Sequence, residues 1–243
     1  MKNYSSNKKL FLGLLICEII LSYMKNELNE IVKDLPSKPE IMGSRNLQIS
    51  AVLVPFIRIN DEYQLLFEKR ADHIRQGSEI SFPGGGFEAE YDTNFQDTAI
   101  RETCEELGIE PENIRVYKPF ETVVVPHGKI IYSFKGEIDS AVLDSMKPNH
   151  EVQYAFTVPL KCFLENEPEI YQARSQIFSF KIDSYGNEKI LFPAEELGIP
   201  NKYQKAWGKR LYPIYVYRVQ NEVIWGITGQ IIFELMQKLR KAI

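Results

Sequence analysis

The stretch SFPGGGFEAEYDTNFQDTAIRETCEELGI, residues Ser81–Ile109, decides the fold, because it places three consecutive glycines just before an acidic helical pattern. The pattern over residues 93–107 predicts a helix. Gly108 follows it and suits the left-handed conformation in which many helices end. Gly84–Gly86 follow a predicted strand and allow a close backbone approach that side chains would block.

Three glutamates share one face of that helix. At about 100° per residue, Glu106 and Glu105 lie about 40° and about 60° to either side of Glu102. Like charges at this spacing repel, so a compensating cation is expected, and Arg101 can also hold Glu105 from one turn away. Magnesium binds a few carboxylates and takes further oxygens from water and substrate phosphates. On the opposite side, three residues are expected to pack against a sheet: Ile100, Cys104 and Leu107.

Two simpler interpretations compete with a metal site. A solvated surface helix with one salt bridge accounts for the glutamates alone, and a flexible loop is left open for the glycines and glutamates together. A plain loop, however, has no need for three glycines. A tight glycine turn that brings an acidic helix beside a strand end is a way to build a metal-diphosphate site, so we favour that interpretation.

Residues 101–109, RETCEELGI, resemble the second half of the Nudix box, Arg-Glu-apolar-x-Glu-Glu-x-Gly-apolar, with Thr103 departing from the first apolar position. The first half of the box is a Gly, five residues, a Glu and seven residues. Here Phe87 and Thr93 occupy the usual Gly and Glu positions, so the glycine loop is longer. Three residues are left open as substitutes for the missing acid: Glu88, Glu90 and Asp92.

A second resemblance points to the coenzyme A pyrophosphatase branch of that family. Residues 65–85 are similar to its signature Leu-Leu-x-x-Arg-Ser-x-x-Leu-Arg followed by Gly-x-Val-x-Phe-Pro-Gly-Gly, with Ala71 in place of Ser and the glycine displaced to Gly77. Residues 224–229, IWGITG, are similar to an Ile-Trp-Gly-x-Thr-Ala segment near the end of that branch. The resemblance therefore extends over residues 46–240.

The resemblance implies an α+β fold, an α/β/α sandwich with a mixed β-sheet and a loop-helix catalytic motif. It implies Mg²⁺ or Mn²⁺ as cofactor, held by Glu102, Glu105 and Glu106. It also implies that backbone at Gly85 and Gly86 approaches the substrate, and that Arg101 orients groups rather than reacting.

Sequence leaves the general base open. One of the box glutamates is a candidate, and so is Glu151 in a later loop, while His127 and His150 are weaker candidates because lone loop histidines are commonly solvated. Arg70 and Arg75 are expected to pair with substrate phosphates, for which arginine is well suited, although ordinary surface charges remain an alternative.

The function that the resemblance implies is metal-dependent hydrolysis of the diphosphate bond of coenzyme A or its derivatives to 4′-phosphopantetheine and 3′,5′-ADP. One alternative is a Nudix pyrophosphatase acting on ADP-ribose or another dinucleotide, because the box reports diphosphate chemistry and not the flanking group. A non-catalytic nucleotide-sensing domain is the other alternative. The expected partner is a small nucleoside diphosphate derivative, and a homodimer is left open.

The chain order predicts strands separated by single helices, and hence a mixed sheet covered by helices. A hairpin is expected at Asn60-Asp61, an irregular region from 165 to about 210, and a closing helix capped by Thr228. Further strands are expected over 47–59, 62–70, 114–125, 129–138, 151–160, 211–219 and 222–227.

Composition narrows the class of protein. The 243 residues are 44% apolar, enough for a core, and the net charge of -4 does not favour nucleic-acid binding. Cysteines stand only at 17, 104 and 162, outside any zinc or disulfide pattern, so we expect a reducing cytoplasm.

The N-terminal region is divided in two. The apolar run in residues 1–23 contains Glu18 and lacks a small-x-small cleavage site, so we expect no stable membrane association and a true start at Met24. Residues 24–45 are expected to form a helix and a linker, and 46–243 the Nudix domain.

Overall fold

The structure is a computed structural model that describes residues 32, 33, 35, 36, 41, 43, 46–126 and 128–242. The chain divides into two units, 1–45 and 46–243, and the fold described here is that of the second. The apolar run, most of the predicted N-terminal helix, and His127 lie outside the described residues. In the described part, every helix is too short or too polar to cross a membrane.

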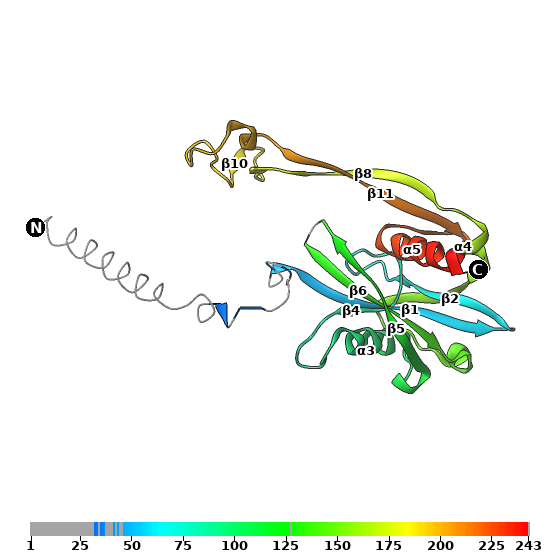
Figure 1. Ribbon diagram of the computed structural model, residues 1–243. Helices are drawn as coiled ribbons and strands as arrows, with labels where there is room; N and C mark the ends of the chain where they lie inside the picture. The colour runs from blue at the N-terminus through cyan, green and yellow to red at the C-terminus, as the bar shows by residue number, and fades with distance from the viewer. Residues whose placement is uncertain are drawn as a thin grey trace, which may run out of the picture. The chain divides into compact units, whose positions relative to one another are not determined.

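The centre of the second unit is a mixed sheet (Figure 1). Its strand order is β3-β2-β1-β6-β5, with β4 paired to β1 and β7 paired to β2. The β1–β6 pair is parallel and the other pairs are antiparallel, so the sheet is mixed, as the sequence predicted. The strands are β1 (Gln48–Ile59), β2 (Glu62–Arg70), β3 (Ile80–Ser81), β4 (Gly84–Gly86), β5 (Ile114–Val125), β6 (Lys129–Ile138) and β7 (Val152–Pro159).

The first hairpin forms where it was predicted. Asn60 and Asp61 have φ angles of 49° and 64°. Both central positions of a type I′ turn require a positive φ, which Asn and Asp tolerate. The turn sets the register in which Phe56 lies opposite Leu65. Local turn chemistry therefore fixes how β1 and β2 pair.

Helices cover both faces of the sheet. Leu53 and Leu66 pack on the side of α3 (Phe95–Leu107), while the adjacent residues Val54 and Leu65 pack on the side of α5 (Gly226–Ala242). This alternation is the period of two that a strand imposes on its side chains. Burying one such side chain contributes about 1.5–3 kcal/mol. The predicted sandwich is confirmed.

The N-terminus of α5 differs from the prediction. The helix begins at Gly226, so Thr228 lies inside it and does not cap it. The Thr228 hydroxyl instead donates to the carbonyl oxygen of Ile80, at 3.2 Å, and so ties the helix to β3. The short helices are η2 (Pro111–Asn113), η3 (Ser140–Ser145), α4 (Leu160–Glu165) and η4 (Asn201–Gln204).

The region predicted to be irregular contains ordered strands. β8 (Glu169–Ile177) pairs antiparallel with β11 (Trp207–Val219), and β9 (Phe180–Ile182) pairs with β10 (Glu188–Ile190). We call residues 169–211 the arm; it forms a long ribbon in Figure 1. β12 (Glu222–Ile224) pairs with β11 beyond the arm. The prediction was wrong because β8 buries neither face, so its sequence carries no alternating pattern.

Candidate active site

The glycine turn places backbone against two neighbours. β4 pairs with β1, and Gly84 has a φ of +150°, a conformation that side-chain residues rarely adopt. A Cβ atom at Gly84 would lie 2.3 Å from the carbonyl oxygen of Ala51. At Gly85 it would lie 2.3 Å from the carboxylate carbon of Glu102, whereas at Gly86 it would meet nothing within 4 Å. Backbone contacts therefore require a glycine at position 84, whereas a side chain at position 85 would displace the Glu102 carboxylate.

Helix α3 is fixed at both ends by local signals. The Asn94 side chain accepts hydrogen bonds from the backbone N–H groups of Gln96 and Asp97, which is the usual N-cap arrangement. Gly108 ends the helix with a φ of 64°, as predicted. Thr103, the departure from the box pattern, is buried and donates its hydroxyl proton to the Ala99 carbonyl. A polar residue thus fits the apolar position.

The buried face of α3 differs from the one predicted. Leu107 is buried as expected, but Ile100 and Cys104 are only half-buried, while Glu106 is 4% exposed. The helix turns Glu106 inward because the backbone N–H of Gly84 donates to Glu106 Oε2, at 2.8 Å. The Glu106 carboxylate therefore lies inside the protein, beside the glycine turn. The acidic face is not fully opposite the apolar face of the helix.

A second buried carboxylate, Glu68 of β2, lies beside Glu106. Arg70 Nη1 lies 3.7 Å from Glu68 Oε1 and 3.9 Å from Glu106 Oε1. Burial raises the pKa of both carboxyl groups, and the proximity of Glu68 raises that of Glu106 further. Sequence analysis missed Glu68. Its signal was an acid at a strand position that shares a face with the buried Leu66.

Arg101 connects the glycine turn to the helix. Its guanidinium donates to Asp92 Oδ1 at 2.9 Å and Oδ2 at 3.1 Å, and to the carbonyl oxygen of Gly86 at 3.1 Å. It also forms ion pairs with Glu102 at 3.0 Å and Glu105 at 3.3 Å, the latter as predicted. Hydrogen bonding to Arg101 lowers the pKa of Asp92 to about 2.

Of the three acids that the sequence left open, Asp92 is the one that the structure joins to Arg101. It is buried and holds Arg101, whereas Glu88 and Glu90 are exposed. The three alternatives that the sequence left open are thereby separated by burial. Sequence alone had no basis for this choice, because all three acids lie within five residues of one loop.

The remaining predicted residues lie at different depths. Glu105 is 54% exposed, and Arg75 is exposed while its carbonyl oxygen accepts from Arg70 Nε at 3.4 Å.

Glu151 lies near the buried acid Glu68. Burial is the main cause that raises the pKa of Glu68, and the negative charge of Glu151 raises that pKa further. The exposed His150 stacks on His73 with ring centroids 6.3 Å apart.

Lys129 is a further cation that sequence analysis missed. It is half-buried at the start of β6. Burial lowers the pKa of its ammonium group, and the charges of Arg75 and Arg70 lower it further. The charges of Arg70 and Arg75 thus act on Lys129, and Arg70 lies within 3.9 Å of both buried carboxylates. We call these three residues the basic cluster.

The donor set fits a hard divalent cation. Glu68, Glu102 and Glu106 supply carboxylate oxygens around the glycine turn, and Glu68 Oε2 is buried with no hydrogen-bond donor among the described residues. In the described part of the chain, no three acidic, histidine or cysteine side chains converge closely enough to enclose an ion as they stand. Arg101 accounts for part of this, because it pairs with Glu102 and Glu105.

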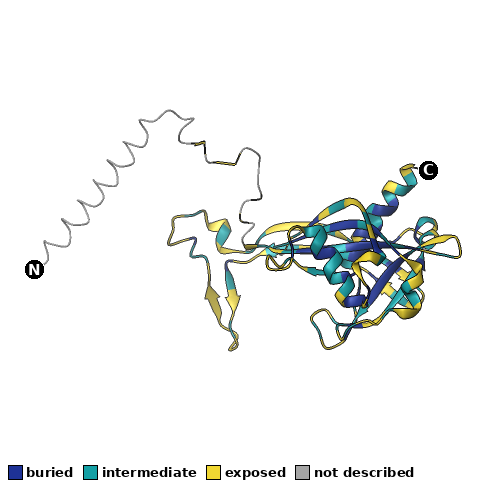
Figure 2. Cartoon of the chain, turned by 90° about the horizontal axis from the view of Figure 1, so that it is seen from below, coloured by how far each residue is buried: buried dark blue, intermediate teal, exposed yellow. Residues whose placement is uncertain are grey.

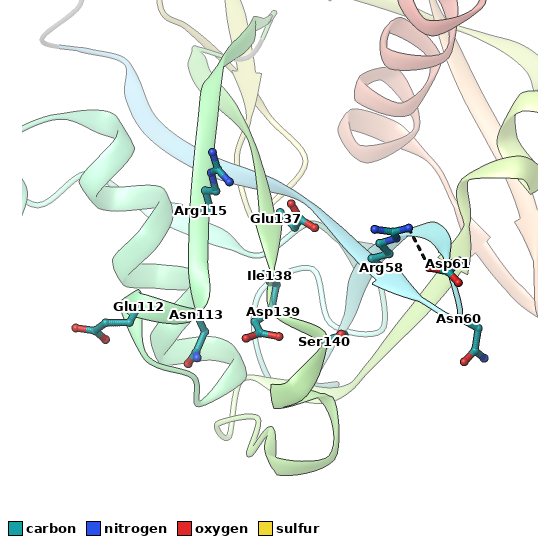
Figure 3. Close-up of a pocket in the computed structure, with 10 residues that line it drawn as sticks. All are labelled: Arg58, Asn60, Asp61, Glu112, Asn113, Arg115, Glu137, Ile138, Asp139 and Ser140. Carbon is teal, nitrogen blue, oxygen red and sulfur yellow. Dashed lines mark hydrogen bonds and ion pairs between the residues drawn. The ribbon is translucent and has the colours of Figure 1, made fainter.

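Two cavities lie away from these residues. One of about 620 Å³ adjoins the β1–β2 turn, where Arg58 and Asp61 form an ion pair of 2.9 Å across it (Figure 3). Another of about 410 Å³ is lined mainly by β7 and its neighbours. Neither is lined by a box glutamate or by the basic cluster. The convergence of buried acids, cations and glycine backbone, and not cavity volume, marks the candidate site.

The family follows from a domain-level match: the model of the NUDIX domain matches residues 48–213. The chain belongs to the Nudix family. The expected α+β Nudix fold and the expected class, a Nudix hydrolase acting on a diphosphate, are confirmed. The match includes the whole box and β2, and it ends within β11.

Named relatives of this Nudix hydrolase include coenzyme A diphosphatases. Nudix hydrolase 3 of Caenorhabditis elegans is 26% identical over 198 residues, covering 76% of this chain and 80% of that protein. The peroxisomal coenzyme A diphosphatase of Mus musculus is 30% identical over 154 residues, 61% of this chain and 63% of that protein. The mitochondrial coenzyme A diphosphatase of Homo sapiens is 34% identical over 132 residues, 50% of this chain and 52% of that protein.

Solved structures similar to this Nudix chain include a MutT/nudix family protein from Enterococcus faecalis, with a TM-score of 0.42 and 14% identity, covering 99% of this chain and 76% of that one. A binary complex of an Ap4A hydrolase from Caenorhabditis elegans has a TM-score of 0.39 and 20% identity, covering 46% of this chain and 80% of that one.

Proposed function

We propose that this Nudix hydrolase cleaves the diphosphate bond of coenzyme A or its derivatives, giving 4′-phosphopantetheine and 3′,5′-ADP. The observation that carries the proposal is the basic cluster beside the box. Arg70 comes from the segment that resembles the coenzyme A branch, and it lies 3.9 Å from Glu106. Coenzyme A bears a third phosphate besides its diphosphate. Arg75 and Lys129 can supply charge for that group.

Glu102, Glu105 and Glu106 would hold Mg²⁺ or Mn²⁺, and Glu105 must turn away from Arg101 to do so. When bound, the cation neutralises charge on the diphosphate oxygens and lowers the pKa of the attacking water. The chain contributes the positioning. Gly85 and Gly86 keep the backbone free of side chains beside the acids, and Arg101 holds the turn against α3.

For the general base we propose Glu151, with a box glutamate as the alternative. Glu151 lies at the start of β7, and its backbone carbonyl accepts from Ala71 N–H at 2.8 Å, next to Arg70 on the adjacent strand. Burial is the main cause that raises the pKa of Glu68, and the negative charge of Glu151 raises it further, so Glu151 lies near that buried acid. A Glu151→Gln variant that retains full kcat would favour the box glutamate.

A cytoplasmic location and a homodimer stay predictions. Neither Cys104 nor Cys162 forms a disulfide, which is consistent with a reducing compartment. The oligomeric state is measured directly by light scattering of the purified chain.

The test is a substrate panel with product identification. Purified protein is incubated with coenzyme A, ADP-ribose or NADH and Mg²⁺ or Mn²⁺, and products are identified by mass spectrometry, with Glu106→Gln as the control for contaminating activity. We expect 4′-phosphopantetheine and 3′,5′-ADP at the highest kcat/KM. A higher kcat/KM for ADP-ribose or NADH contradicts the coenzyme A proposal. Failure to hydrolyse any diphosphate would support the nucleotide-sensing alternative.

A further inference from the structure

Glu68 is an acid at a position that the strand pattern reserves for an apolar side chain. Along β2, Leu66 and Glu68 point to the same face of the sheet, and both are buried, with exposures of 1% and 0%. Glu68 lies opposite Ser81 of β3 and Ala155 of β7, in the interior of the sheet. A buried charge there is costly unless it is paired, so its presence calls for a specific partner.

The chain satisfies only one of the two carboxylate oxygens. Glu68 Oε1 accepts a hydrogen bond from the Ser81 hydroxyl at 3.0 Å. Glu68 Oε2 has no hydrogen-bond partner, and among the described residues it is the one buried side-chain atom of which this is true. A buried acceptor without a donor costs about 1–3 kcal/mol, and more when it is charged. Such an oxygen is suited to a positively charged ligand.

The carboxylate lies within the candidate site. A single nitrogen, Arg70 Nη1, stands 3.7 Å from Glu68 Oε1 and 3.9 Å from Glu106 Oε1, both beyond hydrogen-bond length. Glu106 Oε2 is held by the N–H of Gly84. Two buried carboxylates therefore face each other around one guanidinium. One positive charge does not balance two negative ones, and a bound divalent cation would supply the missing positive charge.

We propose that Glu68 is a further direct ligand of the divalent cation, supplied by the face of β2 that looks toward helix α3. The ligand set would then join a strand to a helix, with Glu68 from the sheet and Glu102, Glu105 and Glu106 from α3. A cation held in this way couples the two elements, so its binding stabilises the folded protein. The inference rests on the cation site of the proposed function, but not on coenzyme A as the substrate.

The test measures Mn²⁺ binding without substrate. Mn²⁺ affinity is determined by electron paramagnetic resonance and calorimetry for the full chain, for Glu68→Gln, for Glu106→Gln, and for Glu62→Gln as the matched control. Glu62 lies on the same strand and is exposed, so its substitution makes the same charge change away from the site. Thermal unfolding is recorded for each protein with and without Mn²⁺.

We expect Glu68→Gln to weaken Mn²⁺ binding by ~10-fold or more and to reduce the Mn²⁺-induced rise in Tm, as Glu106→Gln does and Glu62→Gln does not. Without metal, Tm should not fall, because the glutamine oxygen still accepts from Ser81 while one buried charge is removed.

Unchanged Mn²⁺ affinity in Glu68→Gln, with Glu106→Gln weakened, overturns the inference and leaves Glu68 as a structural partner of Arg70 or of a buried water. A fall in metal-free Tm with unchanged Mn²⁺ affinity has the same meaning. If the unsubstituted chain itself binds no Mn²⁺, the cation site fails, and with it the proposed function. A different preferred substrate with the Mn²⁺ results as expected leaves the role of Glu68 in place.

Discussion

The glycine turn with α3 and the arm distribute polar and apolar groups in opposite ways. Around the turn, buried polar groups such as Asp92, Thr103 and Glu106 each have a partner within the chain. The arm instead exposes large apolar side chains, among them Ile170 at 59%, Phe178 at 51%, Tyr185 at 88%, Ile190 at 65% and Leu211 at 59%. Figure 2 shows most of the arm as exposed or intermediate, whereas the buried residues gather in the sheet and in the helices that cover it.

This difference indicates how each region is held together. The turn and α3 are held in place by backbone hydrogen bonds, side-chain hydrogen bonds and packing contacts together. Small changes there should therefore have large effects on turnover. The arm is a two-stranded ribbon held mainly by backbone pairing, and such ribbons are marginal by themselves. Single side chains on the arm should therefore matter little.

The largest expected effect is on turnover. Glu106→Gln should lower kcat by ~10³-fold, within the ~10²–10⁴-fold range typical of an essential acid-base or charge-positioning group. The fold should persist, because the glutamine oxygen can still accept from the Gly84 N–H. Steady-state kinetics and circular dichroism measure the two properties. Glu105→Gln, at a position 54% exposed, should show a smaller loss, and equal losses would contradict the role of burial.

Close contact at the glycine turn gives the next effect. Gly85→Ala should lower kcat by ~10-fold or more, because the new Cβ would lie 2.3 Å from the Glu102 carboxylate and would push that side chain out of the site. The free energy of unfolding should change little, because the end of the Glu102 side chain can move. Gly86→Ala is the matched control, since its Cβ meets nothing within 4 Å. Urea unfolding and kinetics of both variants decide the matter. A similar kcat in the two variants would show that the turn is looser than the structure indicates.

The Asp92–Arg101 pair should contribute to the stability of the folded protein. Arg101 lowers the pKa of Asp92 to about 2, so the contribution, about 2 kcal/mol, is present above the unfolded pKa of about 4. It should be lost as pH falls from about 4 through 2, as the carboxylate of the folded state gains a proton. Asp92→Asn should remove this pH dependence in urea unfolding, whereas Glu90→Gln, at an exposed position, should not.

The smallest effect is expected in the arm. Ile190→Ser should change the free energy of unfolding by less than about 0.5 kcal/mol and leave kcat unchanged, because the side chain is 65% exposed. Leu53→Ala, fully buried in the sheet, should cost about 2–5 kcal/mol by comparison. A cost above about 1 kcal/mol for Ile190→Ser, or a shift in elution volume on gel filtration, would mean that the arm is covered in solution. The difference between the arm and the glycine turn with α3 would then not hold.

Sequence analysis succeeded where the signal is local. The hairpin at Asn60-Asp61, the helix ending at Gly108 and the Arg101–Glu105 pair all depend on residues within four positions of one another. It failed for the arm, because strands with two exposed faces carry no period. It also misplaced the buried side of α3. That side was predicted from the positions of the apolar residues, which do not reveal the hydrogen bond that the Gly84 N–H donates to Glu106.

The amino-acid sequence by itself determined the family, the turn chemistry, the acidic helix and the type of residue at the site, because these follow from short-range spacing and residue identity. Tertiary structure alone decided which acids meet. Glu68 and its partner Ser81 are 13 residues apart, and Gly84 and Glu106 are 22 apart, so only sheet pairing and helix packing bring them together. The environment of a carboxylate is a property of everything folded around it, and spacing along one chain does not specify that environment.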